Sequence, residues 1–162
     1  MKGWRNPGVL AALLFVLAVI NVAIAGRIRL EREGEVLLLE LAPVDPRSLM
    51  QGDYMALAFT LEQEVRTQAN ARHADGYLVV RRDPRQVARF VRLQAAPLPC
   101  AADELALRYR VRNGRPRIVT NAWFFPEGQA ERYAPARYGE FRVGQDGEAL
   151  LVALRDQELR PL

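Results

Sequence analysis

The order of apolar and polar positions divides the chain into one long apolar run and a series of short alternating segments. The run, residues 9–25, contains no charged side chain, and as a helix it is about 26 Å long at about 1.5 Å per residue. This length is enough to cross a thin bilayer. Because no helix breaker interrupts the "RIRLERE" that follows, we expect the helix to continue until Gly34.

Three interpretations of the apolar run are possible. A buried helix of a soluble protein is the least consistent with its length, and a cleaved signal peptide is suggested by the small residues of Ala23-Ile24-Ala25. We favour an uncleaved anchor that contacts the lipid bilayer through residues 9–25, since the run exceeds a usual signal core. Lys2 and Arg5 precede it, which predicts a cytoplasmic N-terminus in the inner membrane of a bacterium, with residues 27–162 in the periplasm or outside.

Asn21 is the one polar side chain within this span. It is either an amide solvated near the membrane edge or a hydrogen-bonding contact with the helix of a membrane-protein partner.

Beyond Gly34 the pattern has the period of two that strands show. Residues 35–41 and 54–61 are predicted strands, residues 76–93 a hairpin turning at "DPRQ", and residues 105–125 a hairpin at Asn113-Gly114. Residues 138–156 repeat the scheme, and the stretches 61–72 and 127–136 favour short helices or loops. The predicted class is mainly β (α+β): a tip, anchor and helical stalk over 1–33, then a compact, largely antiparallel domain over 34–162.

Composition excludes several functions. From Gly26 onward there are 21 basic and 19 acidic residues, interleaved without a basic face, so we expect no nucleic-acid binding. One His and one Cys cannot supply the three or four ligands of a classical zinc site, and we expect no metal and no cofactor. Nucleophilic catalysis would have to combine Ser48, Cys100 or a Thr with His73, the single imidazole.

The stretch "PVDPRSLMQGDYMALAF" spends about a dozen residues on one connection, where a simple hairpin needs about two to five. Its "GDYMALAF", together with "LELAPVDPRSLMQ" before it and "FFPEGQAERYAPARYGEFRV" further on, resembles the bacterial GDYXXLXY family over most of residues 35–154. Phe59 stands where the family name has Tyr, so we expect packing rather than a phenol at that position. The resemblance implies a membrane-anchored bacterial domain and carries no reaction with it.

The matching segments supply the candidate structural or binding residues, which are Asp45, Arg47, Gly52, Asp53, Tyr54, Glu127, Arg137, Glu140 and Arg142. We expect Asp45, Arg47 and Asp53 to form a polar cluster near the 127–142 segment. Two functions stay open. The first is a non-enzymatic accessory subunit with a membrane-protein partner, expected if each carboxylate is paired with arginine; the second is a carboxylate-dependent hydrolase, expected if two unpaired carboxylates face one cleft.

The "LMQGD" of this stretch also resembles a motif of type I signal peptidases. The Ser–Lys chemistry of those enzymes is excluded, because the sole lysine, Lys2, lies on the other side of the predicted span.

Overall fold

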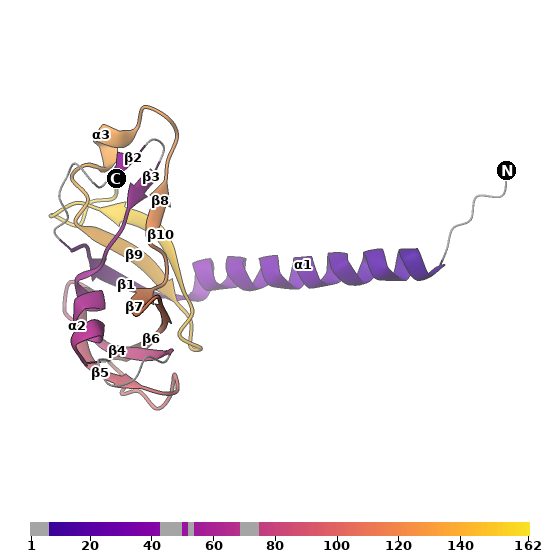
Figure 1. The fold of residues 1–162 in the computed structure, drawn as a ribbon, viewed down its shortest axis with the longest axis horizontal. Helices are drawn as coiled ribbons and strands as arrows, with labels where there is room; N and C mark the ends of the chain where they lie inside the picture. Colours follow the sequence, from indigo (N-terminus) through magenta and orange to yellow (C-terminus); the bar gives the residue numbers. More distant parts are fainter. Residues whose placement is uncertain (1–6, 43–49, 52–53, 69–74) are drawn as a thin grey trace.

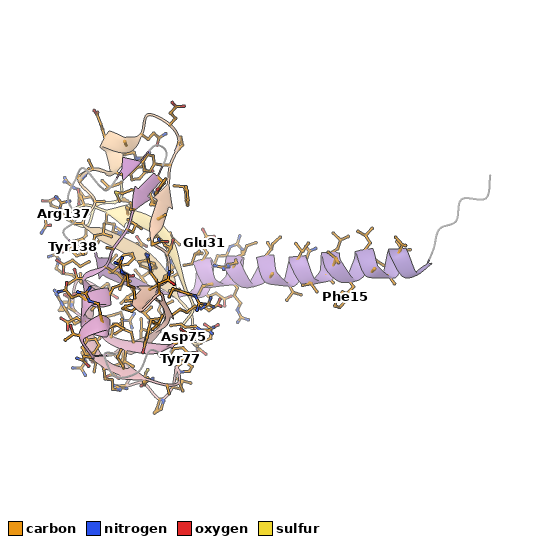
Figure 2. The ribbon with its side chains drawn as sticks, in the orientation of Figure 1. Phe15, Glu31, Asp75, Tyr77, Arg137 and Tyr138 are labelled. Atoms are coloured by element: carbon orange, nitrogen blue, oxygen red, sulfur yellow. The ribbon has the colours of Figure 1, made fainter. Side chains whose placement is uncertain are left out.

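The computed structural model describes residues 7–42, 50–51, 54–68 and 75–162. Its first element, α1 (Pro7–Glu33), projects away from a β domain (Figure 1). Every described side chain from Gly8 to Arg29 is exposed, and Figure 2 shows Phe15 pointing away from the helix into open space. The helix is long and apolar enough to cross a membrane, and none of its apolar window is covered by the domain. The described domain therefore does not bury this helix.

The helix ends where the sequence predicted. The backbone N–H of Gly34 donates to the carbonyl of Leu30 at 2.9 Å, and the chain passes directly into β1 (Glu35–Glu40). A Cβ at Gly34 would lie 2.4 Å from that carbonyl oxygen, so the transition requires glycine. Arg142 caps the junction, because its Nη1 lies 3.4 Å from the Gly34 carbonyl oxygen.

Three antiparallel sheets form the domain, as the alternating pattern predicted. The first has the order β1-β9-β10, with β9 (Tyr138–Val143) and β10 (Ala149–Arg155); the second has the order β2-β3-β8, with β2 (Met50–Gln51), β3 (Tyr54–Ala56) and β8 (Ala122–Phe124). The third has the order β5-β4-β6-β7, with β4 (Gly76–Arg82), β5 (Ala88–Gln94), β6 (Glu104–Arg112) and β7 (Arg115–Ile118). Two short helices, α2 (Thr60–Gln68) and α3 (Ala130–Tyr133), complete the α+β class.

One core joins these sheets. Phe59 is 2% exposed and meets the fully buried Phe141 edge to face, with 5.5 Å between ring centroids. The expectation that the ring at position 59 serves packing is thus confirmed. Gly139 lies against the same two rings, and a Cβ there would come within 2.9 Å of Phe141.

The predicted strand over 54–61 is too long. β3 ends at Ala56 and α2 begins at Thr60. Met55, Leu57 and Phe59 are buried with a period of two, whereas Leu61 and Val65 are buried four residues apart, which is the helical spacing. The apolar pattern changes period inside the segment, and the predicted strand ran past that change.

Candidate functional site

A groove of about 820 Å³ opens on the domain beside the end of α1. Its walls come from α1, β6, β7, β8, the loop 119–121 and the start of β10. The lining residues are Arg27, Arg108, Arg110, Arg112, Arg117, Val119, Thr120, Asn121, Ala122, Trp123, Phe124, Gly147, Glu148, Ala149, Leu150 and Leu151. Five of these sixteen are arginines, and Glu148 is the one acidic residue in the set.

Strand geometry explains why the arginines gather. Arg108, Arg110 and Arg112 alternate along β6, so they stand on the same face of the sheet, and all three are exposed. The turn at Asn113-Gly114 has positive φ at both residues and returns the chain as β7, which places Arg117 directly opposite Arg110. Arg115 is likewise directly opposite Arg112. Like charges directly opposite each other destabilise a sheet.

Most of these arginines have no side-chain partner in the described part of the chain, as is also true of Arg32 and Arg66. Within the described ranges, the side chains of Arg27, Arg108, Arg110 and Arg115 have no hydrogen bond and no ion pair, and Arg112 reaches only the neighbouring Val111 carbonyl at 3.5 Å. The arginines of the opposite flank pair with carboxylates: Arg82 with Glu35 at 2.6 Å and Arg89 with Asp83 at 3.1 Å.

The floor of the groove is apolar and aromatic. Phe124 is 74% exposed, although it is large and apolar, and its ring lies 5.7 Å from that of Tyr54. Trp123 packs edge to face against Tyr133, and its buried indole Nε1 has no acceptor among the described residues. The groove therefore combines cationic walls with an apolar floor.

Glu62 of α2 is a carboxyl group beside β7 whose pKa is raised. Burial between α2 and β7 raises the pKa, and the hydrogen bond from the backbone N–H of Ile118 (3.2 Å) and the charge of Arg117 oppose this rise only in part. The sequence analysis did not single out Glu62. Its position in the first turn of a short helix looks like ordinary helix capping in the sequence.

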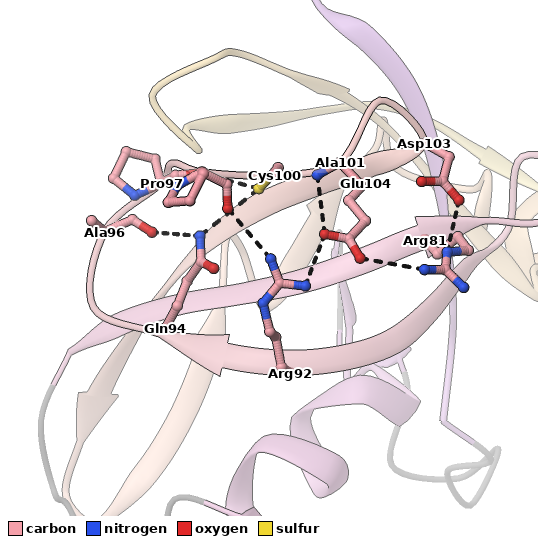
Figure 3. A network of polar contacts seen from close by, with 10 residues as sticks. Arg81, Arg92, Gln94, Ala96, Pro97, Cys100, Ala101, Asp103 and Glu104 are labelled. Carbon is pink, nitrogen blue, oxygen red and sulfur yellow. Dashed lines mark hydrogen bonds and ion pairs between the residues drawn. The ribbon is translucent and has the colours of Figure 1, made fainter.

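The buried carboxylates of the described domain are held by arginine. Glu104, whose side chain is 5% exposed, receives Arg92 Nη1 at 2.8 Å, Arg81 Nη2 at 3.4 Å and the N–H of Ala101 at 3.3 Å (Figure 3). The hydrogen bond from Arg92 is the main cause that lowers the pKa of Glu104.

Asp156 is held in a similar way by one residue. Burial alone would raise the pKa of Asp156, but the backbone N–H and the guanidinium of Arg160, the latter at 2.7 Å, lower it overall.

Glu140 is the candidate carboxylate that the structure places in the core region. Its side chain is 9% exposed, and Arg155 Nε and Nη2 both lie 2.6 Å from its Oε2. Arg142 is a weak partner, with its Nη2 4.0 Å from Glu140 Oε1. Arg155 was missed by the sequence analysis, although the antiparallel pairing of β9 with β10 brings it beside this carboxylate.

The other candidates do not form one site with Glu140. Arg137 and Glu127 are exposed, and the guanidinium of Arg137 bonds only to the carbonyl of Ala136, at 2.8 Å; Figure 2 shows Arg137 on the flank away from α1. Tyr54 lies on β3, opposite Phe124 of β8. The remaining four, Asp45, Arg47, Gly52 and Asp53, lie outside the described residues, and so does the cluster predicted for them.

Asn21 is exposed on α1, and its amide Nδ2 donates to the carbonyl of Leu17 at 2.8 Å. One N–H of the amide is thus satisfied within its own helix. Among the residues that the structure describes, no group of three or more His, Cys, Asp or Glu side chains could hold a metal ion.

Comparison with known proteins gives one match. The family model described as "GDYXXLXY protein" matches residues 16–154. No curated protein and no solved structure matches the chain.

Proposed function

The chain belongs to the GDYXXLXY family, whose name describes a sequence motif, and from this premise we propose that it is a membrane-anchored, non-enzymatic interaction subunit. α1 crosses the cytoplasmic membrane of a bacterium once, with the N-terminus inside, and residues 34–162 form a domain in the periplasm or outside. The partner is another membrane protein of the cell envelope.

The exposed apolar surface of α1 is the observation that carries this proposal. The large side chains of the run, such as Leu14, Phe15 and Val22, are 58%, 71% and 74% exposed. Burying such side chains stabilises each by about 1.5–3 kcal/mol relative to water, so a helix of this composition needs a membrane or a protein around it. The described domain does not provide that cover.

The state of the carboxylates favours interaction over catalysis. Glu104, Glu140 and Asp156 are each held by arginine, and such pairs organise loops and sheets without chemistry. A carboxylate-dependent hydrolase is the second candidate, and the raised pKa of Glu62 favours it, because a general acid needs such a pKa. If Glu62→Gln restores a deletion strain as fully as the parent chain does, acid–base catalysis by this group is excluded.

Photo-crosslinking in native membranes tests the accessory role. A photoreactive residue in place of Asn21 should give one discrete adduct with a second membrane protein, because the polar face of the helix marks the contact. A photoreactive residue at Phe15, a matched position in the same span, should give lipid adducts alone. Identical adduct patterns at the two positions would contradict a specific partner helix.

Retention of the anchor has its own test. The N-terminal sequence of the protein purified from membranes should lie upstream of the apolar run. A sequence that begins at Gly26 would show that Ala25 is a cleavage site.

A further inference from the structure

Arginines of β6 and β7 lie directly opposite one another and repel each other electrostatically. Arg110 faces Arg117, and Arg112 faces Arg115, in two directly opposed cross-strand pairs. Like charges directly opposite each other destabilise a sheet. No carboxylate among the described residues lies within ion-pair distance of these four, although the charge of Arg117 acts on Glu62. An anion from outside the fold would remove this repulsion, so this face favours anion binding.

The place of this face identifies where the anion comes from. Arg27 follows Gly26 directly after the apolar run 9–25, so it marks the level at which the span leaves the hydrocarbon. Arg27 also lines the groove together with Arg108, Arg110 and Arg117. Figure 1 shows α1 leaving the domain beside β10, whose first residues form another wall of the groove. The arginines therefore lie at the headgroup level of any membrane that α1 spans.

The chemistry of the groove fits a phosphate attached to an apolar body. Guanidinium groups bind phosphate oxygens in pairs of parallel hydrogen bonds. Trp123, Phe124, Ala149 and Leu151 line the groove and provide apolar surface. The volume of about 820 Å³ lies within the usual range of ligand pockets, about 300–1,000 Å³.

We propose that the groove between β6, β7, β8 and the end of α1 binds the phosphate headgroup of an anionic phospholipid from the membrane that α1 spans. Arg27, Arg108, Arg110 and Arg117 contact the phosphate, and the aromatic floor contacts the glycerol and the first carbons of the acyl chains. This inference rests on the proposed membrane anchoring. It adds a ligand that the interaction subunit does not require.

The test uses the full chain in a neutral detergent, with short-chain phosphatidylglycerol as the probe and phosphatidylcholine of the same acyl length as the zwitterionic control. Phosphatidylglycerol should raise the melting temperature and stay bound in native mass spectrometry, and phosphatidylcholine should do neither. The effect should weaken as salt rises, because the arginines are exposed. Equal effects of the two lipids would overturn the proposal.

A double variant locates the site. Arg108→Gln with Arg110→Gln should weaken phosphatidylglycerol binding by about tenfold or more, since each arginine near a charged surface contributes about 1 kcal/mol. The lipid-free melting temperature should be unchanged or higher, because an opposed like-charge pair is relieved. The control is Arg66→Gln with Arg89→Gln, which removes the same charge from exposed positions outside the groove. Equal losses in both variants would overturn a specific site.

Two further experiments distinguish a failure of the lipid-binding proposal from a failure of the proposed membrane anchoring. Glycerol 3-phosphate and inorganic phosphate carry the same anionic group without acyl chains, and either one competing as well as the lipid would overturn a membrane source. Extraction of native membranes with alkaline carbonate tests the anchoring alone. A chain that stays in the membrane but ignores phosphatidylglycerol overturns only this inference, whereas a chain released by carbonate overturns the proposed function.

Discussion

At the residue scale, buried charge in the β domain follows one rule. Glu104, Glu140 and Asp156 each lose most of their contact with water, and each gains arginine donors at about hydrogen-bond distance. A buried carboxylate without such donors would be strongly destabilising. The sequence named no arginine partner for Glu140, because pairing across β9 and β10 depends on a register with a bulge between Leu151 and Ala153.

Arg155→Met tests this pairing. The variant leaves the nearly buried carboxylate of Glu140 without its main donor, and we expect the free energy of unfolding to fall by about 2–3 kcal/mol. Arg89→Met is the matched control: its ion pair with Asp83 is largely exposed on the arginine side, and its loss should cost at most about 1 kcal/mol. Chemical denaturation measures both values. Equal losses would show that the Glu140–Arg155 pair is no more important than a surface ion pair.

Glu62→Gln tests the one half-buried carboxyl with a raised pKa. A raised folded-state pKa contributes stability that is present below the ordinary value of 4.5 and is lost as pH rises through the folded value. The Glu62→Gln variant should therefore have the same melting temperature as the parent at acid pH. At neutral pH its melting temperature should be higher than that of the parent. Glu104 and Asp156, whose pKa values are lowered, change stability with pH in the opposite sense in both proteins, so the difference between the two melting curves isolates Glu62. A variant that melts lower at neutral pH would contradict this account.

At the element scale, local signals predicted the hairpins and failed where tertiary packing decides. The Asn113-Gly114 and Asp83-Pro84 turns were predicted correctly, because these residue types themselves favour the backbone dihedral angles of a turn. The predicted strand over 54–61 failed because burial of Leu61 and Val65 on a helix became visible only against the sheets. The groove was missed from the sequence for the same reason. A row of arginines on β6 looks like an ordinary solvent face until β7, β8 and Arg27 enclose it.

Gly139→Ala tests the packing of β9. The added Cβ would lie 2.9 Å from Phe141 and 3.1 Å from Leu151, in the centre of the core. We expect a loss of about 1–3 kcal/mol, the usual cost of overpacking. Gly26→Ala is the matched control, because a Cβ there meets nothing within 4 Å. A Gly139→Ala variant as stable as the parent would show that β9 shifts to accommodate the methyl group.

At the scale of the whole molecule, one apolar helix and one β domain meet at a basic groove. The sequence alone predicted the two parts, since an uncharged run and a period of two are both local patterns. It did not predict the groove, which needs Arg27 of α1 to approach strands more than 80 positions away in the chain. An anchored domain with such a groove is suited to contacts at the membrane surface.

Chemical labelling of a single cysteine tests the central claim, which is that α1 holds the β domain outside the cytoplasm. In a Cys100→Ser chain, Glu131→Cys provides one exposed thiol on α3. A membrane-impermeant maleimide added to intact spheroplasts should label it as fully as in lysed cells, with the labelled protein in the membrane fraction. Labelling that requires lysis, or labelled protein in the soluble fraction, would contradict the account.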